Sequence, residues 1–102
     1  MKIVVIHPEA SAEVHDSVEW YESQRLGLGL EFLEEYESTL RRIAADPEDN
    51  SPDPTPPFKY RRLIRFPYRI IFLEMESRLW IAAVPHHSRR SGYWSTRSPD
   101  DM

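Results

Sequence analysis

The chain begins with a short apolar run and then changes to a helical pattern. Residues 3–6 read IVVI and are followed by Pro8, which predicts a strand and then a helix with proline in its first turn. Apolar residues then recur every three or four positions over two stretches, 10–21 and 32–44, on either side of the sequence LGLG at 26–29. This spacing is typical of amphipathic helices, and so short a break between them predicts an antiparallel helical hairpin.

The pattern changes again after a proline-rich segment. Residues 47–57 hold five of the nine prolines, so we expect a loop there. Beyond it, residues 58–66 alternate between apolar and basic side chains, and two apolar runs at 68–75 and 79–84 are separated by a short turn. These features predict three consecutive antiparallel strands. Arg62 interrupts the alternation, which leaves the register of the first of these strands open.

The order strand, helix, helix, strand, strand, strand predicts an α+β fold. We expect the helical hairpin to pack on one face of an antiparallel sheet, with the apolar side chains between the two layers. With 102 residues, of which 40% are hydrophobic, the chain is long enough for one core and too short for a second domain, so residues 1–102 are expected to form a single domain. Residues 98–102 are expected to be a flexible tail.

The composition excludes several classes of protein. The chain has no cysteine, which excludes disulfides and thiolate metal sites and fits a reducing compartment. Its first ten residues contain one lysine and only four consecutive apolar residues, too few for a signal peptide or a membrane span. We therefore expect a cytoplasmic protein with no membrane partner.

The net charge of −4 conceals an uneven distribution. Residues 1–57 contain four basic and 13 acidic residues, a charge of −9, whereas residues 58–97 contain nine basic and two acidic residues, a charge of +7. Since most of these acidic residues belong to the predicted helices, the sheet face turned away from the helices should be basic, which favours a polyanionic partner. The residues that we expect to share this surface are Arg61, Arg65, Arg69, His86, His87, Arg89 and Arg90.

The densest group of functional side chains is the sequence VPHHSRRSGYW at 84–94. Cleavage of RNA by its own 2′-hydroxyl needs a base, a cation at the phosphate and an acid, which histidine and arginine can supply, while aromatic rings stack on unpaired bases. Ordinary structural roles remain open for all of them, including packing of Tyr93 and Trp94 against the sheet edge. His86 and His87 are neighbours on a strand and point to opposite faces, so we expect no metal site there, and we expect no cofactor.

Several motifs together resemble one protein family. HPEA at the start of the first helix, WYE within it, FPYRIIF at 66–72 and AVPHHSRRSGYW at 83–94 are similar, in order and spacing, to the RelE/ParE superfamily of type II toxin-antitoxin toxins. The resemblance runs from Ile3 to about Arg97. It implies two helices on an antiparallel sheet, and a bacterial growth-inhibiting toxin that a cognate antitoxin holds inactive. RelE-like members cut mRNA on the ribosome, whereas ParE-like members inhibit DNA gyrase without a known catalytic apparatus.

The resemblance also implies roles for individual residues. Arg69 matches the arginine that stabilises the phosphate, Tyr93 matches the C-terminal tyrosine of the nucleases, and His87 stands where another catalytic arginine is found. Arg62 falls near a lysine of the preceding strand, with Arg61 as a neighbouring candidate. We therefore predict an mRNA endoribonuclease, with a non-enzymatic gyrase inhibitor and a degenerate protein that only binds its antitoxin as alternatives. The predicted catalytic residues are Arg62, Arg69, His86, His87 and Tyr93, and the predicted RNA-binding or target-binding residues are Arg61, Arg65, Arg89 and Arg90.

Overall fold

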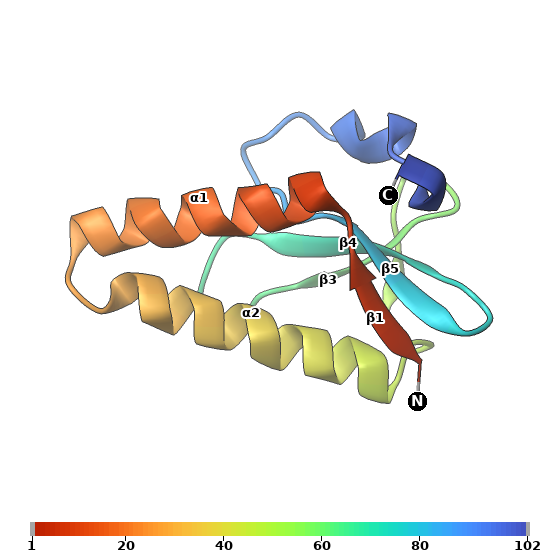
Figure 1. Cartoon of the computed structure of the whole chain (residues 1–102), viewed down its shortest axis with the longest axis horizontal. Helices are drawn as coiled ribbons and strands as arrows, with labels where there is room; N and C mark the ends of the chain where they lie inside the picture. The colour runs from red at the N-terminus through yellow and green to blue at the C-terminus, as the bar shows by residue number, and fades with distance from the viewer. Residues whose placement is uncertain (1, 102) are drawn as a thin grey trace.

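Two long helices lie side by side across one face of a five-stranded sheet (Figure 1). The computed structural model describes residues 2–101, so Met1 and Met102, which the predicted domain and tail include, lie outside the described residues. The elements are β1 (Ile3–Ile6), α1 (Pro8–Gln24), α2 (Leu28–Ala45), β2 (Ser51–Pro52), β3 (Lys59–Arg62), β4 (Arg69–Glu74) and β5 (Arg78–Ala83), followed by the short 3-10 helices η1 (Tyr93–Thr96) and η2 (Pro99–Asp101).

Local interactions explain where the helical hairpin begins and turns. His7 caps α1, because its Nδ1 accepts a hydrogen bond from the Glu9 amide at 3.1 Å. The turn into α2 passes through Gly27, whose φ of +88° favours glycine. The Glu22 carboxylate accepts hydrogen bonds from the amides of Gly27 and Gly29, at 2.9 and 3.1 Å, which ties the end of α1 to the start of α2.

The sheet has the strand order β1-β5-β4-β3-β2. The α+β class and the order of the elements are confirmed, and all neighbouring strands are antiparallel except β1 and β5, which are parallel. The two hairpins β3–β4 and β4–β5 reverse the chain twice, so β5 runs in the direction of β3, and β1 joins the sheet edge beside β5 in that same direction. The proline-rich segment contributes the two-residue strand β2 at the opposite edge, where a proline costs no ladder hydrogen bond on its open side.

Apolar side chains are buried on both faces of the sheet. Between the sheet and the helices lies a core that includes Phe32 and Phe72, as expected. A second cluster lies on the opposite face, where Trp80 and Trp94 are each 0% exposed. The open basic face predicted from the sequence is therefore partly wrong: β4 and β5 carry apolar residues on both sides, and such strands need cover on both sides.

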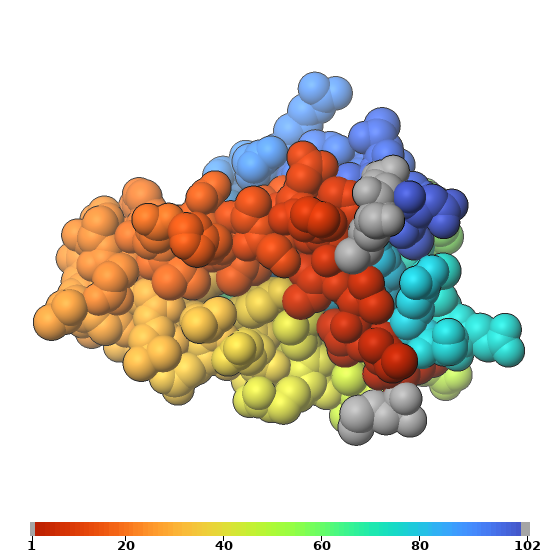
Figure 2. All heavy atoms as spheres, in the orientation of Figure 1, coloured from red at the N-terminus to blue at the C-terminus, as the bar shows by residue number. Residues whose placement is uncertain are grey.

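The C-terminal segment supplies this cover. It runs past the start of α1, as the blue ribbon in Figure 1 shows, and its residues form part of the molecular edge in Figure 2, while the two helices occupy the front. Residues 99–101, which belong to the predicted flexible tail, form the single turn η2. Across residues 2–101, the helices are too short or too polar to cross a membrane.

Candidate functional site

Arg62 and Arg69 lie directly opposite each other on neighbouring strands, at the end of β3 and the start of β4. Both are on the sheet face turned away from the helices, since Arg69 alternates with Ile70, which is buried against the helices. The Arg69 guanidinium lies between two rings, 5.9 Å from the centre of Tyr60 and 5.3 Å from that of Trp94. Within the described residues, neither guanidinium has an ion-pair or hydrogen-bond partner. We call these two residues the arginine pair.

A hollow of about 160 Å³ opens beside the arginine pair. Its other lining residues are Asp53, Pro54 and Tyr60. Asp53 is only 5% exposed, and its Oδ2 accepts a hydrogen bond from the Thr55 amide at 2.8 Å. The carboxylate thus stabilises the turn of its own loop, and the hollow combines two free cations with a wall of proline and tyrosine.

His87 lies on the same face as the arginine pair. Its amide donates to the Pro67 carbonyl oxygen at 2.8 Å, and the Arg69 amide donates to the Pro85 carbonyl oxygen at 3.1 Å, so the antiparallel pairing continues beyond β4 and β5. Desolvation of the ring and, after it, the positive charges of Arg62 and Arg69 lower the pKa of His87. The imidazole is therefore neutral near pH 7 and can accept a proton or a hydrogen bond.

His86 points to the other face. It forms an isolated antiparallel bridge with Tyr68, and the two rings meet edge to face at 5.1 Å. Its Nδ1 accepts a hydrogen bond from the Ser88 amide at 2.9 Å. His86 also lines a hollow of about 220 Å³ beside α1, together with Glu13 and Asp16. The structure thus does not bring His86 to the surface that carries the arginine pair.

Two of the other predicted arginines also lie elsewhere. Arg61 is opposite Ile70, on the helix side of the sheet, and its Nη1 lies 3.4 Å from the Asp49 carbonyl oxygen. Arg65 donates to the Glu31 carboxylate of α2 at 2.9 Å. Both side chains therefore meet acidic segments of the same chain, and they do not extend the surface of the arginine pair.

Tyr93 lies in η1, and its hydroxyl is enclosed. Its Oη is buried without a hydrogen-bond partner in the described part of the chain. Burial and the nearby Glu13 carboxylate raise the pKa of Tyr93 above its usual range. The guanidinium of Arg89 covers the ring at 4.2 Å from its centre, whereas Arg90 is exposed.

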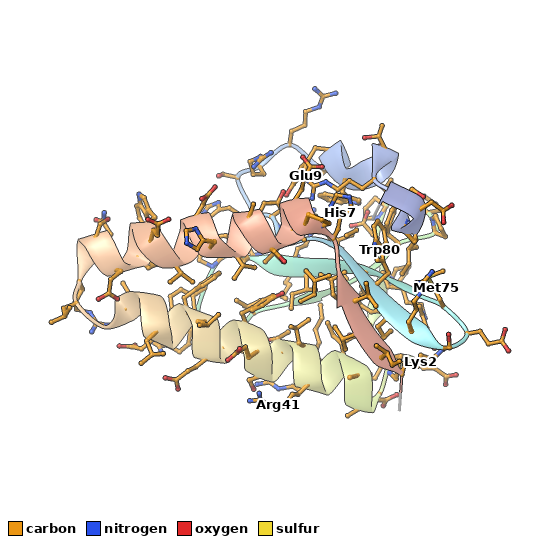
Figure 3. All side chains as sticks on the ribbon, in the orientation of Figure 1. Lys2, His7, Glu9, Arg41, Met75 and Trp80 are labelled. Atoms are coloured by element: carbon orange, nitrogen blue, oxygen red, sulfur yellow. The ribbon has the colours of Figure 1, made fainter. Side chains whose placement is uncertain are left out.

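Glu13 and Arg97 are two important residues that the sequence pattern did not indicate. Arg97 Nη2 donates to Glu13 Oε2 at 2.8 Å, its Nη1 donates to the Ala82 carbonyl oxygen at 2.8 Å, and its Nε lies 3.5 Å from Glu9 Oε2. Figure 3 labels Glu9 at the start of α1, beside the C-terminal segment. The other oxygen of Glu13 accepts a hydrogen bond from the Val84 amide at 2.9 Å. No sequence signal separates Glu13 from the other acids of α1.

One group of potential metal ligands occurs on α1. The ligand atoms of His15, Asp16 and Glu19 all lie within 4.8 Å of one another. All three side chains are exposed, and His15 Nδ1 lies 3.0 Å from Glu19 Oε1. This is an ordinary arrangement for the solvated face of an acidic helix, and it suggests no function.

A helical hairpin on a sheet, with an arginine pair on the opposite face, agrees with the architecture that the resemblance to RelE/ParE toxins implies. A sequence model described as "ParE toxin of type II toxin-antitoxin system, parDE" matches residues 4–91. This match covers most of the chain, which therefore belongs to the ParE family of toxins. The predicted membership of the RelE/ParE superfamily is confirmed, and a type II toxin has an antitoxin as its partner.

A solved structure gives the same fold. The structure described as "Chromosomal ParDE TA system from P. aeruginosa" is similar to this chain with a TM-score of 0.76 and 15% sequence identity. The similarity covers 84% of this chain and 96% of that chain. No curated protein matches the sequence. Residues 92–101, which contain Trp94 and Arg97, lie beyond the match to the family.

Proposed function

We propose that this ParE-type toxin acts by binding and blocking DNA gyrase, and that it does so without cutting RNA. Membership of the ParE family supports this target, since inhibition of gyrase is the activity that similarity to ParE-like toxins implies. The observation that carries the proposal is the separation of the candidate proton-transfer groups. Of the two histidines and the tyrosine predicted to be catalytic, His87 alone lies beside the arginine pair.

Cleavage by general acid-base catalysis needs a second group on the other side of the phosphate. His86 lies on the opposite face against Tyr68, and the Tyr93 hydroxyl is buried with a raised pKa. Asp53, the carboxylate nearest to the hollow, is engaged with the Thr55 amide. The described residues therefore favour a binding surface rather than a site of proton transfer. We place this activity in the cytoplasm, where gyrase and ribosomes are found.

The test compares the two targets with the same purified toxin. Relaxed plasmid is incubated with gyrase and ATP, and supercoiling is followed on a gel; in parallel, ribosome-bound mRNA is analysed by primer extension. We expect supercoiling to stop and the mRNA to stay intact. Arg69→Gln should weaken gyrase inhibition, whereas Arg61→Gln, the same charge change on the other face, should not. Toxin-dependent mRNA ends with unaffected supercoiling would contradict the proposal.

The predicted endoribonuclease remains the second candidate, and one observation favours it. His87 is a neutral imidazole close to two free arginines, so it has the chemistry to take the 2′-hydroxyl proton while Arg69 holds the phosphate. In that case His87→Gln abolishes cleavage of ribosome-bound mRNA. A protein that neither cuts mRNA nor blocks gyrase, yet binds its antitoxin, would match the third alternative, the degenerate family member.

A further inference from the structure

The arginine pair places two positive charges opposite each other without a counter-charge. Like charges directly across an antiparallel pair destabilise a sheet. Two other arginines of the chain do have carboxylate partners: Arg65 pairs with Glu31 and Arg97 pairs with Glu13, at 2.9 and 2.8 Å. The chain has 17 acidic and 13 basic residues, so acids are not scarce. The isolation of this pair thus indicates that its counter-charge comes from another molecule.

The geometry around Arg69 favours a planar anion. Its guanidinium lies over the rings of Tyr60 and Trp94, at 5.9 and 5.3 Å from their centres, and contact with ring faces leaves the N–H groups at the edge of the guanidinium free to donate. A guanidinium fixed in this way forms two parallel hydrogen bonds with a carboxylate and loses little conformational freedom on binding. Arg62 lies directly opposite on β3, and it adds a second cation within reach of the same anion.

We propose that the hollow beside Arg62 and Arg69 binds a carboxylate side chain from an acidic segment of the antitoxin. The hollow of about 160 Å³ suits one acidic side chain. Pro54 and Tyr60 form an apolar wall that the next residue of the bound antitoxin segment can contact. This inference assigns a partner to the surface whatever the target of the toxin is. Bound antitoxin would cover Arg69 and so keep any target from it.

The surroundings favour a protein carboxylate over nucleic acid. A nucleic acid carries a phosphate at each nucleotide and needs a continuous basic track. Here Asp53 lines the hollow, and Asp49 lines the next hollow along β3, of about 430 Å³. Arg61 and Arg65, which would extend the track, point to acidic segments of the chain. A single carboxylate brings one charge to two arginines and meets only Asp53, whose Oδ2 already accepts a hydrogen bond from the Thr55 amide, whereas an extended nucleic acid would also pass Asp49.

The test uses two peptides as probes and nuclear magnetic resonance as the readout. One peptide alternates Glu with Leu, and the other replaces each Glu with Gln. The side-chain Nε–H signals of the arginines are followed as each peptide is added to the full-length toxin. We expect the Arg62 and Arg69 signals to shift and saturate with the Glu peptide only. Binding should weaken about tenfold in Arg62→Gln, since breaking a charged hydrogen-bonded contact costs at least 1.4 kcal/mol.

Matched variants separate this site from general electrostatics. Arg61→Gln removes the same charge from the same strand on the opposite face, so it should leave peptide binding unchanged. Arg69→Lys keeps the charge but loses the planar fork, so it should weaken binding while circular dichroism shows an unchanged fold. Equal binding of the Gln peptide, or equal weakening by Arg61→Gln, would overturn the proposal. So would a short single-stranded RNA that shifts the same signals at lower concentration than the Glu peptide. None of these outcomes depends on gyrase.

Discussion

Arg97 donates a hydrogen bond to Glu13 across a separation of 84 residues in the sequence, with a distance of 2.8 Å between Nη2 and Oε2. The contact joins the C-terminal segment to α1, and the second bond of Arg97, to the Ala82 carbonyl oxygen, joins the same segment to β5. Trp94, three residues earlier, fills the second core and stacks on Arg69. The ion pair thus helps to hold the ring that orients the candidate site.

Replacing Arg97 by alanine should destabilise the fold by about 2–3 kcal/mol, because the side chain is only 10% exposed and its loss leaves Glu13 without its cationic partner. Urea unfolding measures this change. Arg90→Ala, which replaces an exposed arginine of the same segment four positions before the buried Trp94, should change stability by less than about 0.5 kcal/mol. Equal effects of the two substitutions would show that the Arg97 contacts contribute nothing specific.

A double-mutant cycle with Glu13→Gln tests the pair itself. Because Glu13 and Arg97 are in direct contact, we expect the double variant to be more stable than the sum of the single effects implies, by about 1–2 kcal/mol. Additive effects would contradict a direct interaction. Unfolding by urea of the four proteins, at one salt concentration, provides the measurement.

The layers of the fold could be predicted from the sequence because each depends on local periodicity. The spacing of three to four residues around Phe32 predicts a helix with one apolar face, and the apolar run around Phe72 predicts a buried strand; both side chains lie in the core between helices and sheet. The neighbour of β1 could not be predicted in this way, since a run of four apolar residues does not encode which strand it joins. The second core was also missed: the apolar runs at 68–75 and 79–84 leave both faces of their strands apolar, but no periodic pattern identifies Trp94 as the residue that covers the second face.

The candidate site shows the same limit. Alternation along a strand is enough to separate His86 from His87, and the structure places them on opposite sides. The facing of Arg62 and Arg69 depends on the strand register, which the irregular pattern before β4 left open. The engagement of Arg65 by Glu31 depends on where α2 lies over the sheet, and no spacing in the sequence reports that.

Tyr93→Phe should leave growth inhibition intact and raise stability by up to about 1 kcal/mol, since it removes a buried hydroxyl that lacks a partner. Tyr93→Leu should instead destabilise the protein by about 1–3 kcal/mol, because it removes a ring that lies 4.2 Å from the Arg89 guanidinium and 5.1 Å from that of Arg97. Growth assays and urea unfolding check both. Loss of toxicity in a stable Tyr93→Phe protein would restore the predicted catalytic role of the hydroxyl.

Gly29→Ala should destabilise the helical hairpin by about 1–3 kcal/mol, because an added methyl group where α1 and α2 touch would force the two helix backbones apart. A Cβ at this position would lie 2.6 Å from the Val18 carbonyl oxygen, which is too close for two non-bonded atoms. Leu30→Ala, at the next and exposed position, should cost less than about 0.5 kcal/mol. Thermal unfolding compares the two variants, and a Gly29→Ala protein with an unchanged midpoint would mean that α1 and α2 pack less closely than described.

The lowered pKa of His87 predicts a stability that depends on pH. Since desolvation and then Arg62 and Arg69 disfavour the protonated ring, the folded protein binds this proton more weakly than the unfolded chain does, whose histidine has a pKa of about 6.5. The contribution is fully present above that pH, and it is lost as the pH falls through the lower pKa of the folded state. His87→Gln should therefore lose less stability than the wild type between pH 7.5 and pH 5.5, the range around the unfolded value of about 6.5.

Urea unfolding at both pH values measures the difference between the two proteins, and titrations shared by both cancel in the comparison. The charged groups around the ring are Arg62 on β3, Arg69 on β4 and the neighbouring His86. Removing one of them by Arg69→Gln should reduce the loss at low pH, because the protonated ring then meets one positive charge fewer. Arg61→Gln, which removes the same charge from the opposite face of β3, serves as the control and should retain the wild-type loss. If Arg61→Gln reduces the loss as much as Arg69→Gln does, the effect on His87 does not come from the arginine pair.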